Sequence, residues 1–252
     1  RRLRLTGFPL PEENLGYPDF GILRADTAAR LLNLDPERRF LGPEGKRVLD
    51  SLQLPELPAA SGRPLTLMFA VGGAGAQAEI GLQAAAALAG GIREGRVRLH
   101  LVAGVNARVR LIFQDGLRSL GLEDLEGRGV RILFEPDKQR YFESFNRALR
   151  ETDLLWTKPS ELVFYAALGL PLLLAPPIGS QEEFNREWLL GLGAGMDQGD
   201  MRRFDDWFWQ ALSSGGLARA ALNGFLKAPR RGTYTIIEHL AEHAPWPGSP
   251  SP

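Results

Sequence analysis

The chain has 252 residues, and 44% of them are hydrophobic, which is enough to bury a globular core. Its 30 basic and 30 acidic residues balance, so no overall positive field exists to attract nucleic acid or an anionic membrane from a distance. The absence of cysteine excludes disulfides and thiolate chemistry and is typical of a cytoplasmic protein, and no apolar run is long enough to span a bilayer. We therefore expect a cytoplasmic protein without a nucleic-acid partner.

Residues 1–62 are rich in glycine and proline, which interrupt helices and strands, as in Gly42-Pro43 and Leu54–Gly62. One short helix is predicted from about Asp26 to Leu34, where Asp26 or Thr27 can cap the free amides. We interpret this segment as an interdomain connector. Residue 1 is not Met and Leu3–Phe8 resembles the end of a strand, so we expect this sequence to be the later part of a longer chain.

From residue 63 onward, short apolar runs alternate with longer amphipathic stretches. The predicted strands are Leu65–Val71, Val97–Ala103, Val130–Phe134, Leu154–Trp156 and Leu172–Ala175, and the predicted helices between them are Gln77–Ala89, Ala107–Leu120, Lys138–Arg150, Ser160–Leu168 and Gln181–Leu192. The runs are too apolar for a sheet wetted on one face. They predict a doubly wound, Rossmann-like α/β domain over residues 63–244, with a parallel sheet of about six strands.

Three further amphipathic stretches have no strand between them and predict a helical C-terminal end: Phe204–Leu212, Gly216–Leu226 and Gly232–His243. Residues 245–252 are mostly proline, serine and glycine, and we expect a disordered tail there.

The first predicted strand leads into a glycine-rich turn and then a helix. Because glycine has no Cβ, backbone amides in such a turn can approach a phosphate beside the positive end of the helix. A tight turn without a ligand is the alternative, but the run of small residues is longer than a turn requires. The sequence therefore predicts a phosphate site at Gly72, Gly73, Ala74, Gly75 and Ala76.

The same turn also fits the dinucleotide pattern G-x-G-x-x-A, through Gly73, Gly75 and Ala78. That pattern needs an acidic residue after the second strand to hold a ribose diol. The second predicted strand is instead followed by Gly104-Val105-Asn106. The sequence therefore favours another phosphate ligand over NAD.

Two later predicted strands also end in polar turns. After the fourth strand, Lys158 offers a charge for phosphate, Ser160 can cap the next helix, and Glu161 can accept hydrogen bonds from sugar hydroxyls. The fifth strand leads to a helix whose first turns carry Gln181, Glu182 and Asn185. Each turn alone is equally typical of a surface helix start, where acidic residues favour the helix dipole. In a parallel sheet, however, all these turns face one crevice.

These motifs resemble a known enzyme family. The segments Thr157–Glu161, Ala167–Pro171 and Ala175–Asn185 resemble the donor-binding half of GT-B glycosyltransferases. The nearest groups are the monogalactosyldiacylglycerol synthases and the N-acetylglucosaminyltransferase of peptidoglycan synthesis. Thr6–Leu10 resembles the passage between the acceptor and donor domains of those enzymes.

The resemblance implies that the glycine turn holds the diphosphate of a nucleotide sugar, usually a UDP-sugar. Phe134 would border the base, the Lys158 to Glu161 turn would meet phosphate and ribose, and the sugar would meet Gln181, Glu182 and Asn185. It further implies transfer of a hexose or N-acetylhexosamine, without a metal or other cofactor, to an acceptor that is lipid-linked in some members. The base that activates the acceptor belongs to the acceptor domain, so we assign no catalytic residue and expect the chain alone to be inactive.

Several alternatives remain open. A sugar-nucleotide epimerase would need its own acid and base in the crevice, and a non-catalytic nucleotide-binding module would need neither. The string His239–His243 matches the zinc-binding H-x-x-E-H pattern, but a zinc protease needs a third ligand and we expect no metal site. The aromatic residues Trp207–Trp209 are predicted to be core rather than a peripheral membrane contact, and His100, within a strand, is predicted to be structural.

Overall fold

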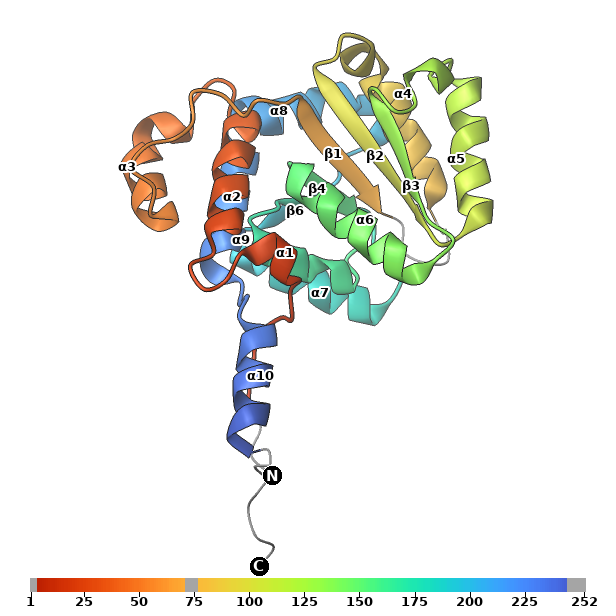
Figure 1. The fold of residues 1–252 in the computed structure, drawn as a ribbon. Coiled ribbons are helices and arrows are strands. Elements are labelled where there is room, and N and C mark those ends of the chain that lie inside the picture. Colours follow the sequence, from red (N-terminus) through yellow and green to blue (C-terminus); the bar gives the residue numbers. More distant parts are fainter. Residues whose placement is uncertain (1–3, 71–76, 244–252) are drawn as a thin grey trace, which may run out of the picture.

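The computed structural model describes residues 4–70 and 77–243, and at its centre is a parallel sheet (Figure 1). The sheet has six strands in the order β3-β2-β1-β4-β5-β6, all paired in parallel. The strands are β1 (Leu65–Ala70), β2 (Val97–Gly104), β3 (Val130–Phe134), β4 (Leu154–Thr157), β5 (Leu172–Leu174) and β6 (Gly195–Asp197). The predicted α/β class and doubly wound parallel sheet are confirmed.

Helices cover both faces of this sheet (Figure 1). The helices α4 and α5 pack together on one face, and α6 crosses the other face on its way to β4. These connecting helices are α4 (Ala78–Arg93), α5 (Ala107–Ser119), α6 (Lys138–Glu151) and α7 (Ser180–Leu192), with short 3₁₀ turns η1 (Glu123–Leu125) and η2 (Glu161–Leu168). The fourth predicted helix is thus a 3₁₀ helix rather than an α-helix.

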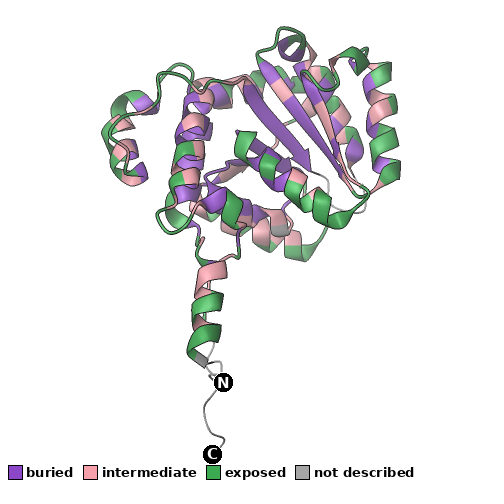
Figure 2. Cartoon of the chain, in the orientation of Figure 1, coloured by how far each residue is buried: buried purple, intermediate pink, exposed green. Residues whose placement is uncertain are grey.

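The central strands are buried on both sides, which is why they appear in the sequence as unbroken apolar runs (Figure 2). Every residue of β1 and β4 is buried, and Trp156 packs edge-on against Phe69 with ring centroids 5.8 Å apart. The edge strand β6 is only partly buried. It has no apolar run, so the sequence gives no local signal for it, and its position depends on its pairing with β5.

The described residues before β1 contain more helix than predicted: α1 (Glu12–Leu15), α2 (Gly21–Leu34) and α3 (Leu41–Leu52). Pro11 and Pro43 do not interrupt α1 and α3, because Pro11 is the N-cap of α1 and Pro43 lies in the first turn of α3, where no amide partner is lost. The predicted cap of the short helix is wrong. The helix α2 begins at Gly21, and Asp26, within it, instead forms an ion pair with Arg150 at 2.8 Å.

The helix α2 is joined to the α/β body by a fully buried arginine. Arg30 donates hydrogen bonds to the carbonyl oxygens of Thr152 and Leu168, each at 2.8 Å, and makes longer ones to Gly169 and Leu149. Burial lowers the pKa of Arg30 to about 10, against the favourable charges of nearby aspartates, so the side chain stays charged at neutral pH. The segment predicted as a connector therefore packs directly on the ends of α6 and η2.

The C-terminal part is helical, as predicted: α8 (Phe204–Ser213), α9 (Gly216–Lys227) and α10 (Gly232–His243), preceded by the 3₁₀ turn η3 (Met201–Arg203). Phe208 is buried and Trp207 and Trp209 pack against the core, which confirms the core interpretation. The helix α10 projects away from the body beside the N-terminal segment (Figure 1). None of the helices in the described residues combines the length and apolar character needed to cross a bilayer. The predicted disordered tail lies outside the described residues.

Candidate functional site

The order of strands reverses between β1 and β4. The chain proceeds from β1 outward to β2 and β3, then returns to add β4, β5 and β6 on the other side of β1. At this point the hydroxyl of Thr157, at the end of β4, donates a hydrogen bond to the carbonyl oxygen of Ala70 at 2.9 Å, which joins the carboxyl ends of the two strands. Ligands of open α/β sheets bind outside the carboxyl ends of strands at such a switch point.

The predicted glycine turn connects β1 to α4 at this switch point. Its residues Gly72, Gly73, Ala74, Gly75 and Ala76 lie outside the described residues, and the structure places only its two ends, Ala70 and Gln77. Gln77 has a left-handed backbone conformation with φ of 72° and does not cap α4 with its side chain. Its side-chain nitrogen Nε2 instead donates to the carbonyl oxygen of Pro176 at 3.3 Å, which links the turn to the end of β5. The helix α4 therefore begins at the switch point, and the free backbone amides of its first turn lie there.

An ion pair joins the turn after β4 to the helix after β5. The ammonium nitrogen of Lys158 lies 2.6 Å from Oε1 of Glu182, and their side chains are only 23% and 15% exposed. The other carboxylate oxygen of Glu182 accepts a hydrogen bond from the amide of Ile178 at 2.8 Å. Partial burial raises the pKa of Glu182, but the bonds from Lys158 and Ile178 outweigh it, so the net pKa lies below the usual value. The carboxylate of Glu182 is therefore charged at neutral pH.

Asn185 completes the link between these two turns. Its side-chain nitrogen donates to the carbonyl oxygen of Pro159 at 3.2 Å, one turn of α7 beyond Glu182. The structure thus brings together three of the residues that the sequence singled out: Lys158, Glu182 and Asn185. Gln181 is exposed in the first turn of α7. The N-cap of α7 is Gly179, which has no side chain to occupy the free amides of that turn.

The other predicted site residues are placed differently. Ser160 occupies the N-cap position of η2, but its side chain makes no capping hydrogen bond, so the predicted cap is wrong. The chain turns tightly just before η2, where the backbone amide of Ser160 donates to the carbonyl oxygen of Lys158 at 2.7 Å. The side chain of Glu161 lies outside the described residues. Phe134 ends β3, two strands away from β1, with the guanidinium of Arg110 5.0 Å from its ring centre.

Sequence reasoning did not identify Gln77 and Thr157 as site residues. Their roles depend on contacts to Pro176 and Ala70, which lie far away in the chain, and so only the strand order reveals them. Among the described residues, no cluster of three or more histidine, aspartate or glutamate side chains is arranged to hold a metal ion.

Comparison with known proteins gives the fold a name. No family model and no curated protein sequence matches this chain. Among solved structures, MurG from Acinetobacter baumannii superimposes with a TM-score of 0.51 at 17% identity, over 73% of this chain and 51% of that one. The domain has the GT-B Rossmann-like fold. SnogD from Streptomyces nogalater, a glycosyltransferase, is a more distant match, with 19% identity and a TM-score of 0.40 over 73% of this chain and 44% of its own.

The fold part of the resemblance seen in the sequence is therefore confirmed. The matched region spans about half the length of the MurG chain, so the likeness concerns only that part of MurG. In this GT-B domain, Lys158 and Glu182 lie at the carboxyl edge of the sheet, beside the switch point.

Proposed function

We propose that this GT-B domain binds a nucleotide sugar, most simply a UDP-sugar, with its diphosphate at the switch point between β1 and β4. The observation that carries the proposal is the Lys158–Glu182 pair, which places a partly buried cation at the edge where α4 and α7 begin. A helix N-terminus and a lysine are both suited to phosphate. Surface packing could explain a helix N-terminus or a lysine alone, but it does not readily explain why both lie together at a switch point.

Each residue of the cluster keeps capacity for a ligand. The ammonium of Lys158 has three donors, and the Glu182 contact is the only hydrogen bond that the described structure gives it. The carboxylate of Glu182 has about four acceptor positions, of which Lys158 and Ile178 use two. In the proposed complex Lys158 bridges a phosphate oxygen and Glu182, while the remaining acceptor positions, with Asn185 and Gln181, face sugar hydroxyls. Phe134 borders the base, and the Ser160–Glu161 turn lies near the ribose.

The reaction that fits this arrangement is transfer of a hexose or N-acetylhexosamine. Departure of a nucleoside diphosphate needs stabilisation of negative charge, which helix amides and Lys158 supply without a metal ion. An acceptor hydroxyl also needs a general base. We assign no such base in this chain, and the matched part of MurG is only 51% of that protein. We therefore expect this chain alone to bind the donor without transferring its sugar.

The test is calorimetric titration of the chain with UDP, GDP, TDP and NAD. We expect one nucleoside diphosphate, most simply UDP, to bind, and Lys158→Gln to weaken that binding by roughly tenfold or more because a charge-assisted hydrogen bond is lost. Lys46→Gln, on the exposed side of α3, is the matched control and should bind as the unaltered chain does. Failure of every nucleoside diphosphate to bind, or binding of NAD alone, would refute the proposal.

A further inference from the structure

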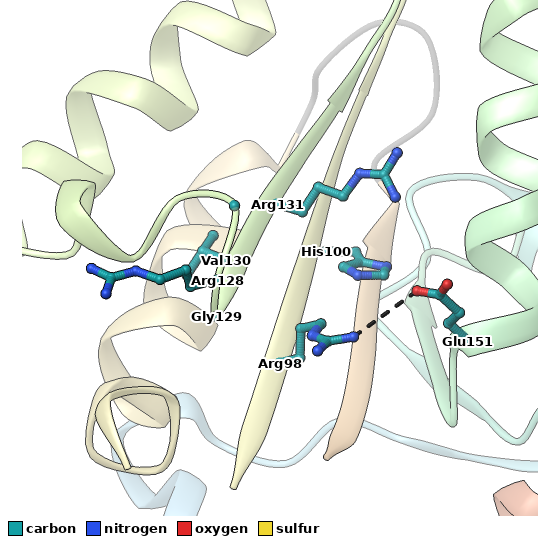
Figure 3. Close-up of a pocket in the computed structure, with 8 residues that line it drawn as sticks. Arg98, His100, Arg128, Gly129, Val130, Arg131 and Glu151 are labelled. Carbon is teal, nitrogen blue, oxygen red and sulfur yellow. Dashed lines mark ion pairs between the residues drawn. The ribbon is translucent and has the colours of Figure 1, made fainter. Parts of the chain in front are cut away.

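A second polar site lies at the opposite end of the sheet. Its cavity, of about 220 Å³, is lined by the first residues of β2 and β3, the turn before β3, and the last residue of α6 (Figure 3). These are the amino ends of the strands, whereas the Lys158 cluster lies at their carboxyl ends. Cavities that hold drug-sized ligands are typically larger than roughly 300 Å³, so this one suits a small ligand.

The lining is strongly basic. It contains Arg98, Arg128 and Arg131 against a single carboxylate, Glu151. The one ion pair within it, from Arg98 to Glu151, is long at 4.0 Å, and Glu151 is half exposed. Arg131 donates only to the hydroxyl of Ser144 at 3.3 Å, and no carboxylate in the described part of the chain lies within ion-pair distance of it. The cavity therefore has more positive charge than its own residues neutralise.

A buried histidine with an unused ring nitrogen lies between two of these arginines (Figure 3). His100 is 1% exposed, and its Nδ1 has no hydrogen-bond partner in the described structure. It pairs in register with Arg131 on β3 and shares a face of β2 with Arg98, two residues earlier. Buried polar atoms in native proteins nearly always have a partner. His100 lines the cavity, so a ligand held there lies beside its ring.

We propose that Arg98, His100 and Arg131 bind a phosphate group, as inorganic phosphate or as part of a small phosphate ester. The planar guanidinium group matches the geometry of phosphate oxygens, and two of them on adjacent strands can hold one anion between them. His100, which lines the same cavity, contributes a ring N–H to this anion. This proposal is independent of the nucleotide-sugar site, because the two sites share no residue.

The surroundings of this histidine favour its neutral form. Burial, followed by the charges of Arg131, Arg98 and Arg63, lowers the pKa of His100 to about 3. Glu151, at the rim, is the one facing carboxylate. A bound dianion adds negative charge beside the ring and raises this pKa, so ligand binding and protonation of His100 favour each other.

Arg128 provides a matched control within the same lining. Its guanidinium points away from His100 (Figure 3) and donates to the carbonyl oxygen of Asp124 at 2.8 Å. Loss of its charge changes the overall charge near the cavity by the same amount as loss of Arg131, but it removes no contact to a ligand between Arg98 and His100. Comparison of the two variants therefore separates a built site from general electrostatic attraction.

The test follows the ring signals of the three histidines by NMR while inorganic phosphate or glucose 6-phosphate is added to the whole chain. We expect the His100 signal to shift saturably, Arg131→Gln to weaken binding by roughly tenfold or more, and Arg128→Gln to change it by less than about twofold. Glu151→Gln should tighten binding, since it removes the only opposing charge. If the ester binds and phosphate does not, the site belongs to a phosphate ester, and the reverse assigns it to the free ion.

Three results would overturn the proposal. In the first, the His100 signal does not respond to either probe at millimolar concentration. In the second, Arg131→Gln and Arg128→Gln weaken binding equally. In the third, Lys158→Gln abolishes the response, which would place phosphate at the other end of the sheet. If Arg131→Gln does not fold, as judged by its circular dichroism, Arg98→Gln replaces it with the same expectations.

Discussion

Replacement of His100 by glutamine should make the protein more resistant to acid. The side chain is 1% exposed, and its pKa falls from 6.5 in the unfolded chain to about 3 in the folded one, through burial and the adjacent arginines. A lowered histidine pKa means that the unfolded state binds the proton more readily. The contribution of the neutral His100 ring to the free energy of unfolding is therefore present above pH 6.5 and is lost as the pH falls toward 3.

The size of the effect follows from these two values. Between pH 7 and pH 4.5 the unfolded chain takes up about three quarters of a proton at His100 and the folded chain almost none, so the free energy of unfolding should fall by ~2.5 kcal/mol through this group alone. Because pH 4.5 lies above the folded value, this figure depends almost entirely on the unfolded pKa. The change in the free energy of unfolding is therefore insensitive to how far burial lowers the pKa of His100 in the folded state.

The assay is urea unfolding of both chains across this pH range in phosphate-free buffers. The stability of His100→Gln should decline less steeply than that of the unaltered chain, by the amount given above, whatever its stability at pH 7. The Val97→Ala variant changes the buried first residue of the same strand, so it loses packing but no ionisable group and should keep the original pH dependence. Parallel decline of His100→Gln and the unaltered chain would refute the reasoning.

Two further predictions concern stability. Gly81→Ala places a Cβ 2.6 Å from the ring of Phe69 and should lower the free energy of unfolding by ~1–3 kcal/mol. Gly90→Ala, on the same helix, has no atom within 4 Å of the new Cβ and should raise the free energy of unfolding by up to ~1 kcal/mol. Equal urea midpoints for the two variants would contradict this prediction. Arg30→Met leaves buried carbonyls without donors and should cost about 3 kcal/mol or more, so a loss below ~1 kcal/mol would show that water replaces the guanidinium.

The apolar runs were sufficient to predict the fold. β3 has the bounds that were predicted, and the other four predicted strands differ by a residue at their ends, because a strand buried on both faces is apolar along its whole length. β6 was not located, since Gly195-Met196-Asp197 is recognisable only by its pairing. The helices α1 and α3 have no clear signal in the sequence, because proline usually indicates a break in a helix, whereas here it lies at the start of one.

The candidate site was predictable only in part. Polar residues at strand ends identified Lys158, Glu182 and Asn185, since parallel strands bring their carboxyl ends to one edge. That Lys158 and Glu182 contact each other was not predictable, because it depends on β4 and β5 being neighbours and on the rotation of α7. The cavity around His100 was also missed, since its arginines come from two strands whose register the sequence does not state.

The entry and exit of this domain lie side by side. The amide of Phe8 bonds to the carbonyl of Pro229, and the amide of Gly232 bonds back to the carbonyl of Phe8. Two backbone hydrogen bonds thus hold together the points where the chain enters and leaves the domain. Such a domain is suited to insertion into an exposed turn of another protein. Because its two ends lie at one point, the insertion would place little strain on the inserted domain or on the protein that receives it.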